Sequence, residues 1–73
     1  MNIASTKDFG ALIKDTRKKN KLTQAQLAAA SGIGERFIRE LEQGKPTCQL
    51  EKALIIAQML GIKIEAANPT MDY

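Results

Sequence analysis

Four charged side chains lie close together in the segment "SGIGERFIRELEQGK", residues 31–45: Glu35, Arg36, Arg39 and Glu40. An arginine guanidinium presents N–H donors in a planar fork that matches a phosphate group or the O6 and N7 atoms of guanine. A carboxylate can accept a hydrogen bond from the N4 amino group of cytosine. These residue types therefore permit base recognition. They equally permit two i, i+4 ion pairs on an ordinary surface helix, Glu35 with Arg39 and Arg36 with Glu40.

Helical geometry sorts this segment into a buried side and an exposed side. At about 100° per residue, Ile38 and Leu41 share the side that is expected to face a core, and both arginines and the second glutamate point away from it. Phe37 lies on the border between the two sides. We expect it to pack against the preceding helix, the alternative being contact with a thymine methyl group. The outward charges thus remain available for a partner.

The stretch before it, "LTQAQLAAASG", predicts a short helix with a defined start and end. Thr23 and Gln26 have the spacing of a capping box, and Leu22 can pack on Leu27 as a hydrophobic staple. Gly32 can adopt the left-handed conformation that ends a helix. Together with the charged helix that follows, this gives two short helices joined by a tight turn, a helix-turn-helix arrangement.

The N-terminal third reads as a basic amphipathic helix. Ser5 and Asp8 form an approximate capping box. The apolar face that follows has the spacing i, i+3, i+4, i+7: Phe9, Leu12, Ile13 and Thr16. Through residue 21 there are six Lys or Arg and two Asp, a net charge of +4, against +3 for the whole chain. Such a surplus suits a polyanionic partner, or is simply a solvated helix face.

The C-terminal third combines a broad apolar helix with a short strand pattern. The expected core stripe of the helix is Leu50, Ala53, Leu54, Ala57 and Leu60, with Ile55, Ile56 and Met59 beyond it. This exceeds what a small core needs and suits an interface. After Gly61, "IKIEA" alternates apolar and polar residues, as a strand does. A lone strand needs a partner, so we expect antiparallel pairing with a second copy through Ile62, Ile64 and Ala66.

Composition excludes several classes of protein. A chain of 73 residues is one domain, and by size scaling it buries only about 60% of its unfolded surface, so a partner subunit would help it. Without histidine and with the single Cys48, it has no disulfide pair, and we expect no metal or cofactor. Apolar runs are too short to span a bilayer and no secretory signal is present, so we expect a cytoplasmic protein. No nucleophile with a base and no phosphate loop is present, so we do not expect an enzyme.

We therefore expect an all-α domain over residues 1–66, with a short C-terminal dimerising β-strand, followed by a flexible tail over residues 67–73. Helices are predicted over residues 6–19, 24–30, 35–44 and 48–60. Pro46 prevents one continuous helix between the last two, and Thr47 is the expected N-cap of the fourth.

The run "LTQAQLAAASGIGERFIRELEQGK" resembles the Cro/repressor (XRE-type) helix-turn-helix family, and the similarity extends over about residues 9–64. The matching positions are Gln24, Leu27, Ala28, Gly32, Ile33, Ile38, Leu41, Glu42 and Gly44, preceded by Ile13, Arg17, Leu22 and Thr23 in "IKDTRKKNKLT". The resemblance implies a lambda-repressor-like fold of four to five helices, with the second helix of the motif in the major groove of DNA. It also implies a buried ion pair between Arg17 and Glu42.

The resemblance also implies which residues contact double-stranded DNA. Gln24, at the start of the first motif helix, is expected to contact a phosphate, and Gln43 and Lys45 are expected to meet the backbone. The remaining candidates lie on or directly before the second motif helix, which is expected to enter the major groove and is the reading helix. The full set is Gln24, Gly34, Glu35, Arg36, Phe37, Arg39, Glu40, Gln43 and Lys45.

The closing "LGIKIEAANP" resembles the HipB-type antitoxins, which partner HipA-type serine/threonine kinase toxins and repress their own operon. This implies a homodimer on a palindromic operator with half-sites about 10 bp apart, and a kinase toxin as a candidate partner that would meet the outer helices or Met71 to Tyr73. Two alternatives remain. One is a stand-alone or phage-type repressor without a toxin, and the other is a protein-interaction module that mainly neutralises a partner.

Overall fold

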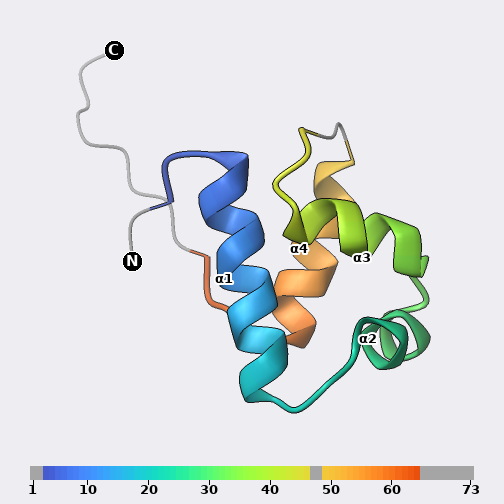
Figure 1. Cartoon of the computed structure of the whole chain (residues 1–73). Helices are drawn as coiled ribbons and strands as arrows, with labels where there is room; N and C mark the ends of the chain where they lie inside the picture. The colour runs from blue at the N-terminus through green and yellow to red at the C-terminus, as the bar shows by residue number, and fades with distance from the viewer. Residues whose placement is uncertain (1–2, 47–48, 65–73) are drawn as a thin grey trace.

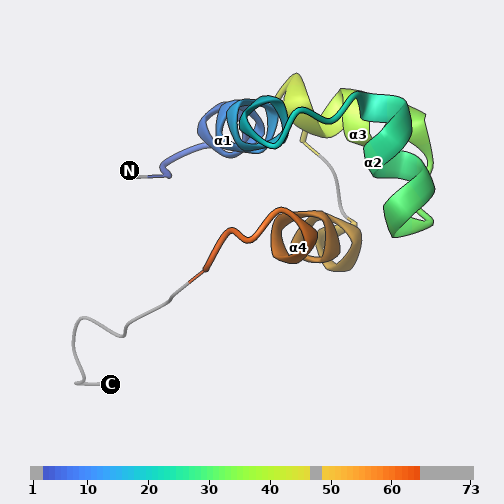
Figure 2. The same cartoon turned by 90° about the horizontal axis from the view of Figure 1, so that it is seen from below.

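The computed structural model describes residues 3–46 and 49–64, and the chain forms four helices there (Figure 1). They are α1 (Thr6–Lys19), α2 (Gln24–Ser31), α3 (Glu35–Glu42) and α4 (Leu50–Met59). Figure 2 shows α1, α2 and α3 along one side of the molecule and α4 along the other. α3 packs against both α1 and α2, and α4 packs against α2. The expected all-α fold is confirmed for the described residues. None of the described helices is long and apolar enough to cross a membrane.

The predicted caps explain where α1 and α2 begin. The Ser5 hydroxyl accepts the backbone N–H of Asp8 at 3.1 Å. Thr23 Oγ1 accepts the N–H of Gln26 at 3.0 Å, and the Gln26 side chain accepts the N–H of Thr23 at 2.8 Å, a complete capping box. Gly32 ends α2 with φ of +74°, in the left-handed region that glycine tolerates best. Local side-chain chemistry therefore fixes the boundaries of the first motif helix.

A single hydrophobic core joins all four helices. Ile13 of α1, Leu27 of α2, Ile38 of α3 and Ile56 of α4 have at most 1% of their surface exposed. The rest of the core consists of Ile33, Leu41, Ala53, Ala57 and Leu60. The pair of motif helices is thus held on α1 and α4 by side chains from every helix.

The prediction for α4 needs correction. The helix begins at Leu50, with Gln49 as an N-cap that makes no side-chain capping bond, whereas a start at residue 48 was predicted. The predicted capping residue and Cys48 lie outside the described residues. The buried stripe is Ala53, Ile56, Ala57 and Leu60. Leu50 was predicted to be in the core but is 66% exposed. At about 100° per residue, Leu50 lies about 70° from the centre of the buried side, farther than any of the four buried residues. Ile56, predicted to lie beyond the stripe, is at its centre.

Two glycines allow α1 to approach α3 and the loop that follows it. A Cβ atom on Gly10 would collide with the backbone carbonyl oxygens of Leu41 and Glu42. Gly44 has φ of +80°, and a Cβ there would lie 2.7 Å from the Cα of Lys7. The Thr6 hydroxyl donates to the Gly44 carbonyl at 2.6 Å. The first turns of α1 therefore fix both the end of α3 and the loop that carries the candidate phosphate contacts.

The end of α4 is closed by its own backbone. Gly61 has φ of +79°, and its backbone N–H donates to the carbonyl of Gln58 at 3.0 Å. The N–H of Ile62 donates to the carbonyl of Ala57 at 2.9 Å. These two bonds form a Schellman motif. Ile62 packs against the core and Ile64 is exposed. Residues 62–64 form no strand in this single chain, where no second copy is present to pair with. Ala66 and the predicted tail lie outside the described residues, so the dimerising strand stays a prediction.

Candidate nucleic-acid interface

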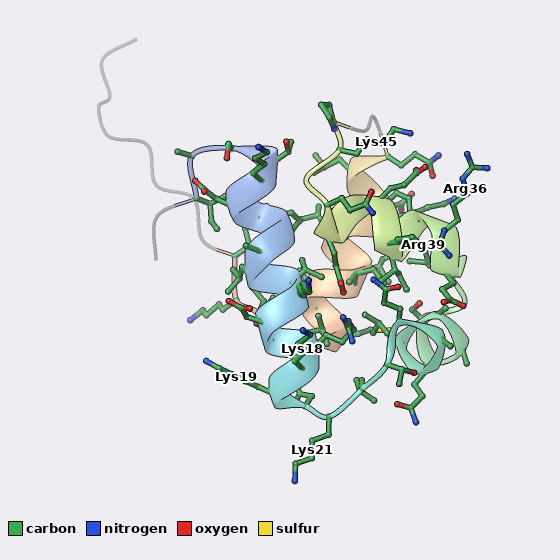
Figure 3. All side chains as sticks on the ribbon, viewed as in Figure 1. Lys18, Lys19, Lys21, Arg36, Arg39 and Lys45 are labelled. Atoms are coloured by element: carbon green, nitrogen blue, oxygen red, sulfur yellow. The ribbon has the colours of Figure 1, made fainter. Side chains whose placement is uncertain are left out.

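α3 presents a charged surface opposite its buried side. Ile38 and Leu41 lie in the core, and Glu35, Arg36 and Arg39 are exposed. Figure 3 shows Arg36 and Arg39 along α3, with Lys45 beyond the end of the helix. This is the division between core and surface that the helical angles predict. The N-cap of the helix, Gly34, is also exposed, and no described atom lies within 4 Å of the place where a Cβ would be.

Glu40 connects the two ends of this surface. Its Oε2 accepts hydrogen bonds from the Lys45 ammonium at 3.2 Å and from Arg36 Nε at 3.4 Å. The hydrogen bond from Lys45, with the positive charges of Lys45 and Arg36, lowers the pKa of Glu40 below its ordinary value. The Arg36 side chain is still 83% exposed, so the remaining N–H donors of its guanidinium are free to bind a further acceptor.

Glu35 and Arg39 do not form the i, i+4 pair that their spacing permits. Within residues 3–46 and 49–64, no ion pair joins them, and both are exposed. The guanidinium of Arg39 makes no hydrogen bond or ion pair with another described residue, and the side chain is exposed. Of the two pairs that the sequence allows on α3, the structure contains only Arg36 with Glu40.

Phe37 packs on the protein. It is half-buried and contacts the hydrophobic core, and the Lys52 ammonium lies 5.8 Å from the centre of its ring. Lys52 belongs to α4, so Phe37 faces the α4 side of the domain. The contact with Lys52 is one that the sequence did not indicate.

Gln24, the first residue of α2, is tied to the end of α3. Its side-chain amide donates to Glu42 Oε1 at 3.0 Å. Glu42 also binds Arg17, with Nε to Oε2 at 2.6 Å and Nη2 to Oε1 at 3.0 Å. The hydrogen bond to Glu42 raises the pKa of Arg17 above its ordinary value, more than burial lowers it. Sequence reasoning placed Gln24 and Glu42 in separate roles, and here they are direct neighbours.

Part of the basic surplus of the N-terminal third, Lys19 and Lys21, lies away from α3, whereas Arg17 is bonded to Glu42 at the end of that helix. Lys18, Lys19 and Lys21 lie at the C-terminal end of α1, where Lys19 and Lys21 point away from α3 (Figure 3). Basic groups at this end also complement the partial negative charge of the helix terminus. The cations beside the exposed side of α3 are instead Arg36, Arg39 and Lys45. Gln43 is exposed in the loop after α3, next to the last of these.

The helices α2 and α3 are joined through the left-handed Gly32, and α3 packs on α1. The outer side of α3 is charged. This is the arrangement of a helix-turn-helix motif. A family model described as helix-turn-helix matches residues 13–66. The chain belongs to the helix-turn-helix family. The HTH-type transcriptional regulator y4mF of Sinorhizobium fredii (strain NBRC 101917 / NGR234) is 45% identical over 67 residues, which are 92% of this chain and 88% of that protein. The ImmF control region 10 kDa protein of Bacillus phage phi105 is 41% identical over 64 residues, 88% of this chain and 71% of that protein.

Solved structures of the same fold include two HipB 20mer complexes. The protein in the HipB(S29A)-O2 20mer complex superposes with a TM-score of 0.83 at 26% identity, covering 96% of this chain and 97% of that one. The HipB-O4 20mer complex gives a TM-score of 0.82 at 24% identity, with 96% and 99% covered, and supports the fold alone. This helix-turn-helix protein is thus similar in sequence to an HTH-type transcriptional regulator and to a phage control-region protein, and similar in fold to HipB.

Proposed function

We propose that the chain is a sequence-specific DNA-binding transcriptional repressor that acts in the cytoplasm on its own operon. The observation that carries the proposal is the exposed side of α3, where Arg36 and Arg39 point outward from a helix whose other side is locked into the core. A helix held in this way can enter the major groove as a rigid unit.

The side chains on this surface divide into base readers and backbone contacts. Arg36 and Arg39 are assigned to guanine through O6 and N7, and Glu35 to the N4 amino group of cytosine. Gln24, Gln43 and Lys45 are assigned to phosphates, which fix the register of the protein on DNA but do not read sequence. Because Glu35 is itself repelled by phosphates, its contribution is the rejection of wrong bases rather than affinity. Glu40 orients Arg36 and Lys45 between these two groups.

Dimerisation is assigned to α4 and the segment after it. Four large apolar residues are exposed in this region of a single chain, by 66%, 38%, 47% and 51%: Leu50, Ile55, Met59 and Ile64. Burying them against a second copy, with antiparallel pairing of residues 62–66, removes this surface from water. Two reading helices related by a two-fold axis then bind a palindrome with half-sites about 10 bp apart.

Selection from a pool of random-sequence duplexes tests the proposal directly. The wild-type chain should enrich a palindrome whose half-sites are separated by about one helical turn. A pool that remains unenriched while the protein is folded, or an enriched sequence without two-fold symmetry, would contradict it.

The oligomeric state tests the interface. Ile64→Asp places a charge in the proposed interface and should yield a monomer in sedimentation velocity at concentrations where wild type is a dimer. Ala11→Asp, which adds the same charge on an exposed position of α1, should leave the dimer intact. A dimer that tolerates Ile64→Asp would place the interface elsewhere.

A finer proposal concerns a second partner. The fold similarity to HipB at 26% identity supports a toxin–antitoxin role, in which this chain also holds a kinase toxin. The similarity to the ImmF control region protein of a phage favours the other candidate, a phage-type repressor without a toxin. Expression of the adjacent gene distinguishes the two. Growth arrest that is relieved by this chain, with co-purification of both proteins, supports the antitoxin, and a harmless neighbour supports the stand-alone repressor.

A further inference from the structure

We propose that the buried ion pair of Arg17 and Glu42 positions the DNA contact made by Gln24, and that its role is therefore recognition as well as stability. The inference rests on the proposed DNA binding. Glu42 acts here as a positioning residue, because it is buried and reaches DNA only through the amide of Gln24.

The ion pair holds α2 on both sides of its N-cap. On one side, Arg17 Nη1 donates to the backbone carbonyl of Leu22 at 2.7 Å, immediately before the capping Thr23. On the other side, Glu42 Oε1 accepts the side-chain amide of Gln24 at 3.0 Å. Arg17 comes from α1 and Glu42 from the end of α3. The first residue of α2 is thus oriented by groups from both neighbouring helices.

The chemistry of Glu42 determines which way the Gln24 amide points. An ionised carboxylate can only accept hydrogen bonds, so the amide must direct its nitrogen, and not its oxygen, toward Glu42. The nitrogen carries two N–H donors, and one of them remains for a further acceptor. The backbone N–H of Gln26 is capped by Thr23, but those of Gln24 and Ala25 have no partner within the helix, and they point out of the same end. A phosphate at this end would therefore meet donors that are already oriented.

Orientation before binding affects affinity. An exposed glutamine at the start of a helix samples several rotamers, and ordering it on binding costs conformational entropy. Gln24 is half-buried, and its hydrogen bond to Glu42 restricts those rotamers in the free protein. If the ion pair served stability alone, any replacement that keeps the fold would keep DNA affinity. If it positions Gln24, such a replacement lowers affinity in a folded protein.

The double variant Arg17→Met/Glu42→Met separates these two cases. It replaces the buried pair by apolar side chains of similar length, an exchange that buried ion pairs often tolerate. It removes one base and one acid, so the net charge stays +3 and the long-range attraction to DNA is unchanged. The probe is a duplex of mixed sequence long enough for two half-sites, used at low salt, because a phosphate contact does not depend on base sequence.

The expected result is a folded double variant whose affinity falls about fivefold per half-site, the equivalent of one neutral hydrogen bond. Gln24→Ala should lose the same factor. The triple variant with all three changes should bind no more weakly than the double variant, because the pair acts through Gln24. The slope of log affinity against log salt should be unchanged in all three, whereas Lys45→Ala should reduce its magnitude by about 0.9 per half-site.

Two results would overturn the inference while leaving DNA binding intact. One is a folded double variant that binds like wild type. The other is a triple variant whose loss of affinity is the product of the losses seen in the double variant and in Gln24→Ala. A wild-type chain that binds no duplex would overturn the proposed function together with the inference. A second measurement needs no change to the ion pair. In the free wild-type protein, the NMR order parameter of the Gln24 side-chain amide should exceed that of the exposed Gln58 on α4, and equal mobility of the two would also refute the inference.

Discussion

Arg17 and Glu42 meet through two parallel hydrogen bonds of 2.6 and 3.0 Å that join α1 to the end of α3. Their side chains are only 9% and 3% exposed. Removing one partner leaves the other as an unpaired buried charge, so Glu42→Ala should lower the free energy of unfolding by about 3–5 kcal/mol. Replacing both by methionine should cost far less. Urea denaturation followed by circular dichroism measures both, and a double variant as unstable as the single one would contradict this account.

Gly10 gives a second stability prediction. Alanine normally stabilises a helix interior by about 1 kcal/mol relative to glycine. At position 10 the added methyl would collide with the carbonyl oxygens of Leu41 and Glu42, so Gly10→Ala should instead destabilise, by about 1–3 kcal/mol. The neighbouring exposed Ala11 provides the control, since Ala11→Gly should cost about 1 kcal/mol. If alanine stabilises both positions in thermal melts, then α1 does not approach α3 this closely.

Phe37 should contribute to stability and not to base reading. Phe37→Leu keeps an apolar side chain of lower volume against the core and loses the contact with Lys52, at a cost of about 1 kcal/mol. The ratio of operator affinity to non-specific affinity should stay at the wild-type value. A ratio that falls at one base pair of each half-site would instead assign Phe37 to a thymine methyl group.

Glu40 should titrate below the ordinary glutamate range. The hydrogen bond from Lys45 is the main cause of its lowered pKa, with a smaller contribution from Arg36. Because the pKa is lower in the folded protein, the stabilisation is present above the pKa of the unfolded chain and is lost as pH falls through the folded value. Lys45→Ala should raise the pKa of Glu40 in a carboxyl ¹³C NMR titration, and Arg36→Ala should raise it less. Equal effects, or none, would contradict the geometry of this cluster.

Local signals in the sequence predicted the first three helices closely. The capping box at Thr23 and the glycine at position 32 act on backbone groups within a few residues. The start and end of α2 can therefore be predicted without the tertiary structure. The outward direction of Arg36 and Arg39 is also local, because helical geometry places them opposite the apolar Ile38 and Leu41.

Features that depend on distant segments were not predicted. The proximity of Gly10 to α3 and the bond from Gln24 to Glu42 both join helices that lie apart in the sequence, and no periodicity encodes them. The burial of Ile56 in preference to Leu50 depends on which side of α4 the rest of the domain covers, which the apolar pattern of α4 alone does not determine. Spacing alone also could not decide between the two ion pairs on α3, because rotamer choice determines which pair forms.

The central claim is that α3 reads bases. Its most direct test compares Arg36→Ala/Arg39→Ala with Lys14→Ala/Lys19→Ala, which removes the same two charges from exposed positions of α1. The quantity measured is the ratio of affinity for the selected operator to affinity for a mixed-sequence duplex, with the fold of each variant checked. We predict that the arginine variant lowers this ratio by about 30-fold or more, and that the lysine variant leaves it unchanged. An arginine variant that is folded and keeps the wild-type ratio would show that α3 is not the reading helix.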